Sequence, residues 1–323
     1  MRAGASALSL LSVPLNVQVL RTLEQEPTLL TDLCRAVGSP PQTTMRARLR
    51  TLTELGALER SSQTELPTSV NYELARSGRE LLHVGKIVQA WLSSSPQGPL
   101  TLGSVTAKSV IKALVEGWST AIIRALAARP LSLADLSRLL SGLSHPSLER
   151  RLAAMRLAGQ VEARFGGSRA TPYAVSDWLR RSVAPLVAAA RWERRHLPDA
   201  TAPIARMDID SIFLLAIPLV SLPTEITGSC RLAVDVGSRA GEVALASVLV
   251  RVEEGRVTSC LARSEGRADA WISGSVSDWT QAVVEQNVDG LELGEEQSFS
   301  RCFLCALKES LFKSKPGDLM LHS

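Results

Sequence analysis

The sequence predicts a multi-domain α+β protein, in which two related units of helices and a β-hairpin precede an α+β domain with a mostly antiparallel sheet. The chain has 323 residues, which exceeds one ordinary hydrophobic core. Residues 17–60 resemble residues 120–163, and from about residue 200 the pattern changes to alternating strands. The expected domains are residues 1–98, 99–198 and 199–323.

Composition indicates a globular chain but not, by itself, a nucleic-acid binder. The residues are 45% hydrophobic and 21% charged, and the formal net charge is only +4. Most of the positive charge is arginine, whose planar fork suits phosphate and guanine. A GC-rich genome also explains an overall arginine bias, so only local arginine placement counts as evidence.

The sequence favours a cytoplasmic protein without a membrane partner. Pro14 interrupts the short apolar run near the start, which does not read as a signal peptide. The most apolar later run, residues 212–222, is too short to cross a bilayer. Five cysteines are an odd, low number for this length, as expected in a reducing compartment.

The repeat is ungapped over its first part. At a shift of 103 residues, eleven of 44 aligned positions are identical. The match then resumes at a shift of 101 residues. The matched pairs include Pro27 with Pro130, Gly56 with Gly159, Tyr72 with Tyr173, and Trp91 with Trp192. The two-residue deletion falls where a variable hairpin tip is expected.

One copy of the repeat predicts three helices, a hairpin and a long helix. Pro27 ends the first helix, and Thr31 with Asp32 can cap the second. The third begins after Ser39 and ends at Gly56. The expected elements are helices over residues 15–25, 33–38 and about 41–55, strands over 57–60 and 70–74, and a helix over about 78–92. This order is that of a winged helix-turn-helix.

The pattern resembles the MarR-like and especially the HxlR-like transcription regulators. The resemblance rests on the step "L...G.L.R" in residues 52–60, the step "Y.L...G..L" in residues 72–82, and Trp91 near the end of the last helix. It covers residues 8–95 and, more weakly, residues 105–196, where the wing is short. The resemblance implies a non-enzymatic regulator whose partner is a double-stranded DNA operator.

The third helix of the first copy carries a basic outward face. With Met45, Leu49 and Leu52 inward, helical spacing turns Thr43, Arg46 and Arg50 outward. The N-terminal half of such a helix meets base edges in the major groove, where arginine pairs with guanine. The alternative is a solvated face in an arginine-rich protein. The DNA-binding residues predicted here are Thr43, Thr44, Arg46, Arg48 and Arg50.

The second copy keeps the core spacing but changes the outward face. Glu149 and Ala153 stand where the first copy has Arg46 and Arg50. We expect the first copy to read bases and the second to contact phosphates. The alternative is that the second copy only completes the scaffold. Tandem copies imply a monomeric pseudo-dimer, or a homodimer, with unequal half-sites. The phosphate-contacting residues predicted here are Arg150, Arg151, Arg164 and Arg169.

From about residue 200 the chain predicts an α+β domain with an antiparallel sheet. Two strands meet at a Glu254-Gly255 turn, a later helix begins with Ser277 as its cap, and an amphipathic helix closes the domain. Over residues 205–312 this order resembles the sterol-carrier-protein fold. The resemblance rests on ADAWISGSVSDWTQAV and GLELGEEQSFSRCFLCAL.

The second resemblance implies a tunnel between sheet and helices that holds a hydrophobic or polycyclic small molecule. Four of the five phenylalanines fall in this third of the chain, although ordinary core explains each residue as well. The expected ligand-binding residues are Phe213, Leu214, Ile217, Trp271, Trp279, Val283, Phe299, Phe303 and Leu307.

Catalytic patterns are missing from the sequence. It contains no Gly-rich phosphate loop, no GxSxG and no HExxH. Cys302 and Cys305 form a lone CxxC, which we interpret as the buried side of a helix rather than a metal site. Asp208 and Asp210 are expected to begin a helix. We therefore expect no enzyme activity, no cofactor and no metal.

The leading hypothesis is a DNA-binding regulator, a repressor, controlled by a hydrophobic ligand in its C-terminal domain. Two alternatives remain open at this point. A carrier protein could use the winged helices only as scaffold. A DNA-acting enzyme built on tandem winged helices, as some DNA glycosylases are, would need a catalytic carboxylate that the sequence does not single out.

Overall fold

The computed structural model describes residues 3–62, 70–115, 117–164, 171–197, 204–237, 245–262 and 267–312. Its contacts divide the chain into two compact units. The first comprises residues 3–115 and 188–201, and the second comprises residues 116–187 and 202–323. The three predicted domains were drawn from the sequence repeat and not from contacts, so their boundaries remain a prediction.

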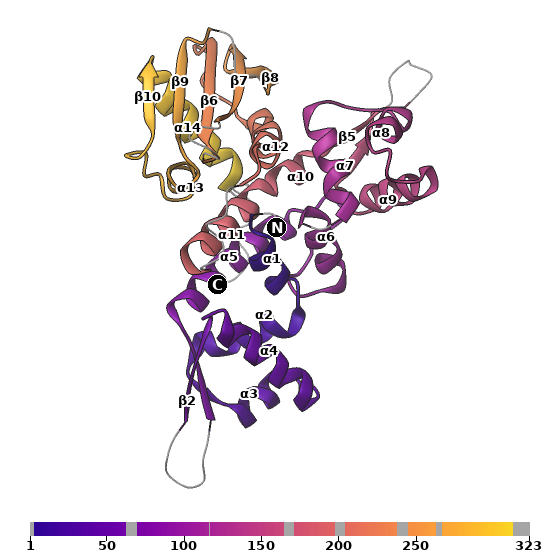
Figure 1. Ribbon diagram of the computed structural model, residues 1–323, viewed down its shortest axis with the longest axis vertical. Helices are drawn as coiled ribbons and strands as arrows, with labels where there is room; N and C mark the ends of the chain where they lie inside the picture. Colours follow the sequence, from indigo (N-terminus) through magenta and orange to yellow (C-terminus); the bar gives the residue numbers. More distant parts are fainter. Residues whose placement is uncertain are drawn as a thin grey trace. The chain divides into compact units, whose positions relative to one another are not determined.

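The first unit has the element order expected of a helix-turn-helix with a hairpin (Figure 1). The strand order is β1-β3-β2, and both pairings are antiparallel. The elements are α1 (Ala5–Leu11), α2 (Pro14–Gln25), β1 (Thr28–Leu29), α3 (Leu30–Ala36), α4 (Gln42–Glu54), β2 (Leu58–Ser62), β3 (Val70–Leu74), α5 (Arg76–Ser93), α6 (Val105–Val115) and the end of α11 (Val183–His196).

Helix α4 is held by the three residues predicted to face inward. Met45, Leu49 and Leu52 are each at most 1% exposed, so the helical periodicity of this segment is confirmed. Gly56, with φ of 67°, follows the helix and adopts the left-handed conformation that glycine tolerates best. The buried stripe therefore fixes which face of α4 points outward.

One capping prediction in the first unit is wrong. Thr28 and Leu29 pair with Tyr72 and Asn71 as strand β1, so the chain enters α3 directly from a strand. The helix begins at Leu30, and its N-cap, Leu29, offers no side-chain hydrogen bond. Thr31 and Asp32 consequently lie inside the first turn of α3, where Asp32 forms an ion pair with Arg35 at 2.9 Å.

The second unit opens with helices that repeat those of the first unit at a constant offset. Three helices begin and end 103 residues after α2, α3 and α4, and the helix after the hairpin begins 101 residues after α5. These elements are α7 (Gly117–Ala128), α8 (Leu133–Leu139), α9 (His145–Leu157), β4 (Val161–Ala163), β5 (Tyr173–Val175), α10 (Asp177–Arg181) and the start of α11.

The repeat extends to individual hydrogen bonds. The N–H of Ala75 donates to the Ala57 carbonyl at 3.1 Å, and the N–H of Ser176 donates to the Gln160 carbonyl at the equivalent place of the second copy at 3.0 Å. Leu131 bridges Tyr173 as Thr28 pairs with Tyr72. The sequence repeat is therefore a repeat of local structure.

The last helix of the second copy differs from that of the first copy. Where α5 is continuous, the second copy has α10 and α11, separated at Ser182. Pro185 accounts for the break, since it has no N–H to donate and its ring opposes the carbonyl of Arg181, four residues earlier.

The remainder of the second unit is a five-stranded sheet with order β10-β9-β6-β7-β8. Strands β6 and β9 pair in parallel, and the other neighbouring strands of this sheet pair antiparallel. The sheet is therefore mixed, with mostly antiparallel pairings as predicted. The elements are α12 (Arg206–Ala216), the 3-10 helix η2 (Ile217–Leu219), β6 (Gly228–Asp235), β7 (Leu245–Glu253), β8 (Arg256–Leu261), β9 (Ala270–Ser275), α13 (Val276–Glu285), β10 (Glu292–Glu295) and α14 (Gln297–Phe312).

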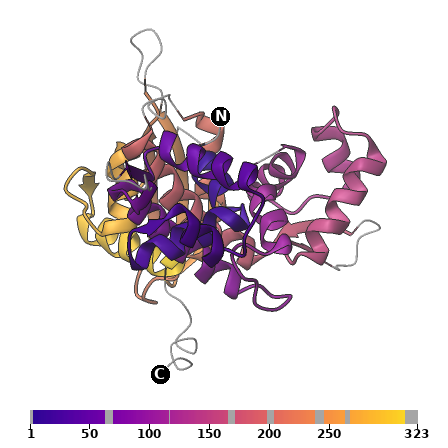
Figure 2. The same cartoon turned by 90° about the horizontal axis from the view of Figure 1, so that it is seen from below.

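One face of this sheet forms the core. Leu232, Val248 and Ile272 lie opposite one another on neighbouring strands and are fully buried. The other face is half-buried or exposed for most of its residues. Helices α12, α13 and α14 contact the strands, as Figures 1 and 2 show. The alternating burial indicates that these helices cover one face of the sheet.

Two details of the sheet were predicted with different success. The Glu254-Gly255 turn is confirmed, and both residues have positive φ, as a tight hairpin turn requires. The predicted cap of α13, Ser277, is wrong. Strand β9 runs directly into the helix, and Ser275 is the N-cap, forming a reciprocal capping box with Asp278.

Within the described ranges, no helix is both long enough and apolar enough to cross a membrane.

Candidate nucleic-acid interface

Helix α4 presents a polar, basic face. The side chains of Thr43, Thr44 and Arg46 are exposed, as is that of Arg50, and Arg48 is half-buried on the flank. Arg50 lies 3.8 Å from Glu54, and both side chains are about two-thirds exposed or more. An exposed pair of this kind contributes little to stability, so the guanidinium remains available to a stronger anionic partner.

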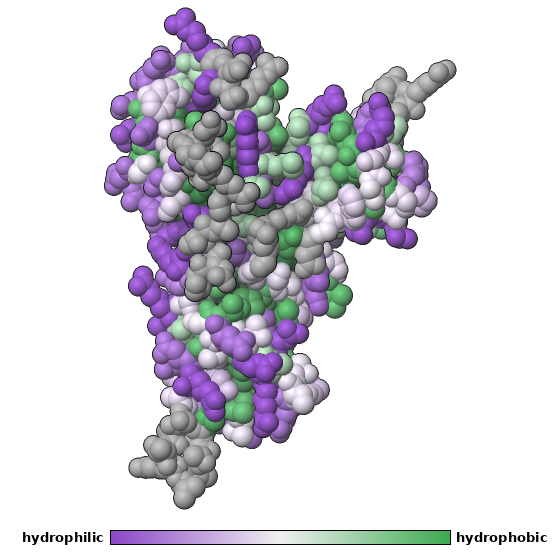
Figure 3. Space-filling view, in the orientation of Figure 1, coloured by the Kyte–Doolittle hydropathy of each residue, from purple (hydrophilic) through white to green (hydrophobic). Residues whose placement is uncertain are grey.

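The turn before α4 sets the angle between α3 and α4. Gly38 and Ser39 both have positive φ, and Pro41 then precedes the first turn of the helix. This is the tight connection of a helix-turn-helix, and it leaves the N-terminal half of α4 at the surface. Figure 3 shows hydrophilic and hydrophobic residues interspersed over this part of the first unit.

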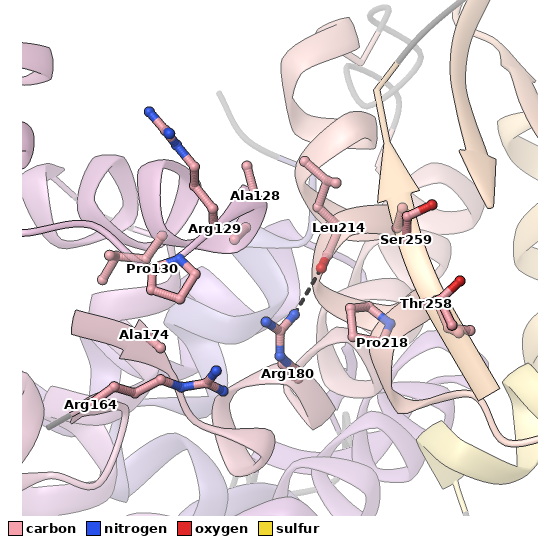
Figure 4. Close-up of a pocket in the computed structure, with 14 residues that line it drawn as sticks. Ala128, Arg129, Pro130, Arg164, Ala174, Arg180, Leu214, Pro218, Thr258 and Ser259 are labelled. Atoms are coloured by element: carbon pink, nitrogen blue, oxygen red, sulfur yellow. Dashed lines mark hydrogen bonds between the residues drawn. The ribbon is translucent and has the colours of Figure 1, made fainter. Parts of the chain in front are cut away.

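The second copy separates the arginines that the sequence grouped together. On α9, Arg150 is exposed and Arg151 is half-buried, with an Nε that has no hydrogen-bond partner among the described residues. Arg164 is exposed beyond β4, and its side chain extends toward Arg180 (Figure 4). Arg169 lies outside the described residues. The predicted phosphate-contacting set is thus divided between two surfaces.

The aromatic residues of the C-terminal part form a packed cluster. The rings of Phe213 and Trp279 meet edge-to-face at 5.3 Å, and the Trp279 indole donates to the Ala233 carbonyl at 2.8 Å. Phe299 and Phe303 make a second edge-to-face pair. Seven of the nine predicted ligand residues are buried: Phe213, Ile217, Trp279, Val283, Phe299, Phe303 and Leu307.

Trp271 and Leu214 are separated from that cluster. Strand alternation places Trp271 on the sheet face opposite Ile272, where its indole lies over Gly294 of the neighbouring strand. Leu214 is half-buried and lines a cleft. The expectation that Cys302 and Cys305 form the buried side of α14 is wrong, because Cys305 is exposed and the buried stripe consists of the phenylalanines.

A cleft of about 190 Å³ lies within the second unit, and sequence reasoning did not find it. Arg180 in α10 donates to the backbone carbonyls of Leu214 and Leu215 at 2.8 and 3.4 Å. Burial lowers the pKa of Arg180; the nearby charge of Asp177 opposes this shift, and that of Arg164 adds to it. The run DWLRR gave no signal of this, since adjacent arginines on a short helix can both face solvent.

Comparison with known proteins finds a family match within the first unit. Residues 13–97 match the family described as HxlR-like helix-turn-helix. The match runs from α2 to the end of α5 and includes α4 with its exposed basic face. This part of the chain is therefore a helix-turn-helix domain of the kind found in DNA-binding transcription regulators, a class that is not enzymatic. No curated protein matches the chain.

Proposed function

We propose that this protein is a transcription regulator that reads an operator with α4 and acts as a repressor controlled by a small molecule. The observation that carries the proposal is the exposed face of Thr43, Arg46 and Arg50 inside a domain that matches an HxlR-like helix-turn-helix. A helix fits the major groove, and arginine can bond guanine O6 and N7 there. Double-stranded DNA is accordingly the expected partner, and the protein is expected to be cytoplasmic.

In this proposal the second copy is a second winged helix that contributes phosphate contacts through Arg150 and Arg151. The constant offset of its helices supports this assignment. Helix α11 of the second copy also docks on α5 of the first, where the Trp192 indole donates to the Ser77 carbonyl at 2.7 Å. Packing of the last helix of one copy on the last helix of the other is the contact expected of a pseudo-dimer within one chain. Because the outward faces of α4 and α9 differ, the operator should have unequal half-sites.

The C-terminal sheet domain is proposed to bind the controlling ligand, as in the sterol-carrier proteins that its order of elements resembles. The aromatic cluster around Phe213, Trp279 and Phe303 supports an apolar ligand. A ligand can shift the DNA-competent population only by its differential affinity for the two states. The ligand should therefore change operator affinity by a factor that saturates with its concentration.

The test is DNA binding by a double variant, Arg46→Ala with Arg50→Ala. Duplexes selected from a random pool by the wild-type chain serve as the operator, and binding is measured at physiological salt. We expect a loss of roughly hundredfold or more, because each guanine contact contributes about 1–3 kcal/mol. The matched control is Arg251→Ala with Arg256→Ala, which removes the same charge from exposed positions on the sheet.

Two results would overturn the proposal. One is an operator affinity of the double variant equal to that of the control variant. The other is a wild-type chain that selects no duplex sequence but binds an apolar ligand. That second result would favour a carrier protein in which the winged helices serve only as scaffold.

A further inference from the structure

We propose that the cleft in the second unit binds a small organic anion, with one carboxylate or phosphate held between Arg164 and Arg180. This site is distinct from the aromatic cluster of the sheet domain, and its regulatory role, though not the binding itself, rests on the proposed function. The described residues that line the cleft are Leu126, Ala127, Ala128, Arg129, Pro130, Arg164, Ala174, Arg180, Leu214, Pro218, Val257, Thr258, Ser259 and Cys260.

The two cations supply the charge of the site. Arg164 follows β4, Arg180 belongs to α10, and their guanidinium groups approach each other across the cleft (Figure 4). Arg129 extends away from them in the same view. None of the described lining residues is acidic. The charge of Asp177 acts on Arg180 from the same helix and opposes the effect of Arg164. An anion between the two arginines would replace repulsion with two charge-assisted hydrogen bonds.

Arg180 is already positioned to receive such a ligand. Its Nη1 donates to the carbonyls of Leu214 and Leu215, which leaves the other N–H groups of the guanidinium for an acceptor in the cleft. The side chain is therefore oriented before any ligand arrives, and little conformational entropy has to be lost on binding. Arg164 is more exposed and can adjust to the size of the anionic group.

The remaining walls favour an apolar body of limited size. Leu126, Leu214 and Val257 offer apolar surface, and the hydroxyls of Thr258 and Ser259 lie on the β8 side of the cleft. The volume of about 190 Å³ suits one or two rings or a short acyl chain better than a sterol. The ligand would touch α7, α10 and the hairpin on one side, and α12 and β8 on the other. A bound ligand would thus contact both the second copy of the repeat, which carries α9, and the sheet.

The test uses 1-naphthoate as the anionic probe and 1-naphthamide as its neutral analogue, with the full-length chain in a calorimetric titration. We expect one naphthoate site per chain, and an affinity at least tenfold lower in the variant Arg164→Gln. The control Arg150→Gln removes an exposed arginine from α9 and should leave naphthoate binding unchanged. The neutral amide should bind more weakly than naphthoate and equally to all three proteins.

A second measurement locates the probe. Burial raises the pKa of the Cys260 thiol, which lines the cleft, to about 12, so its alkylation is slow and is followed over a long labelling time. Naphthoate should slow it further and leave alkylation of Cys305 on α14 unchanged, as read by mass spectrometry of the labelled peptides. The inference is overturned if naphthoate fails to bind, if it binds Arg164→Gln as tightly as wild type, or if Cys260 is not protected.

A role of Arg164 in DNA binding makes a different prediction. Arg164→Gln would then weaken operator binding without any probe, to the same extent as Arg150→Gln, and would leave the naphthoate affinity unchanged. That outcome would assign Arg164 to DNA phosphate and would refute the anion site. A chain that binds naphthoate through Arg164 but selects no duplex would instead keep the cleft and refute the proposed regulator.

Discussion

The Glu80 carboxylate lies 2.8 Å from the Nε2 of His196, and this contact joins α5 to the end of α11. Arg195 approaches the same carboxylate at 3.3 Å. At the offset of 101 residues that relates the two copies here, Glu80 corresponds to Arg181 and His196 corresponds to Ser95. The bridge can therefore form only once, so the pairing of the two terminal helices is asymmetric.

This bridge should make the stability of the first unit depend on pH. Burial alone would raise the pKa of Glu80, but the hydrogen bonds and charges of His196 and Arg195 lower it to about 2. Because the folded-state value lies below the unfolded value of 4.5, the ionised carboxylate stabilises the fold above pH 4.5. That stabilisation is lost as the pH falls from about 4.5 toward 2.

The expected result is a pH-dependent difference between wild type and Glu80→Gln. Near pH 7 the variant should be less stable by about 1–2 kcal/mol, and the difference should shrink below pH 4.5. Urea unfolding followed by circular dichroism at several pH values measures it. Glu54→Gln, which alters a mostly exposed carboxylate, is the control. A difference that stays constant down to pH 3 would show that the bridge is not ionic.

A carboxylate of α11, that of Glu193, supplies the hydrogen-bond acceptor at the start of α1. Glu193 is 6% exposed, and it accepts hydrogen bonds from the backbone N–H groups of Gly4 at 2.6 Å and Ala7 at 2.9 Å. The N-cap residue of α1, Gly4, has no side chain to do this. Burial raises the pKa of Glu193, and the same hydrogen bonds act in the opposite direction.

Glu193→Ala should therefore destabilise the first unit by about 1–3 kcal/mol, since it leaves buried N–H groups without an acceptor. Glu193→Gln keeps one amide oxygen and should lose less. Hydrogen exchange of the α1 amides, together with urea unfolding, checks this expectation. Wild-type protection of those amides in the alanine variant would contradict the capping role.

Gly78 marks a close backbone approach in the helix-turn-helix domain. A Cβ atom at this position would lie 2.1 Å from the Ala57 carbonyl oxygen, which accepts a hydrogen bond from the N–H of Ala75. Helix α5 can contact the start of the hairpin this closely only because residue 78 has no side chain. The glycine therefore determines how α5 packs on the rest of the domain.

Two glycines of α5 provide a matched pair of variants. Gly78→Ala should destabilise the domain by about 1–3 kcal/mol through overpacking. In Gly85→Ala the new Cβ would only touch side chains of Leu11 and Leu102 at 3.5–3.6 Å, so it should be neutral or slightly stabilising. Thermal unfolding compares the two. Equal melting temperatures for both variants would show that the contact at Ala57 relaxes without cost.

The architecture of the helical parts was largely predictable from local pattern. Periodic Met45, Leu49 and Leu52 identified the buried side of α4, and the sequence repeat anticipated helices at the same offset. The errors lie at helix starts. Leu30 follows β1 and Val276 follows β9 without a loop, and a nearby Thr or Ser then becomes a misleading cap signal.

The cleft was beyond prediction for a physical reason. Arg164 and Arg180 belong to different elements, and Arg180 is oriented by carbonyls 34 and 35 residues further along the chain. Only long-range packing creates such contacts, and no spacing rule encodes them. The position of Trp271, in contrast, was predictable. It stands between Ala270 and Ile272 in a strand, so alternation assigns it to the other face.

The two recognition-type helices should respond differently to loss of one arginine. Arg150→Ala, on α9, should weaken binding to operator and unrelated duplexes equally and reduce the slope of log affinity against log salt by about 1, as expected for one lost phosphate contact. Arg46→Ala, on α4, should cost about 1–3 kcal/mol with the operator and little with unrelated DNA, because a base contact confers discrimination. Fluorescence anisotropy across a salt series measures both effects. If Arg150→Ala changed sequence preference while Arg46→Ala did not, the roles of α4 and α9 would be the reverse of those proposed.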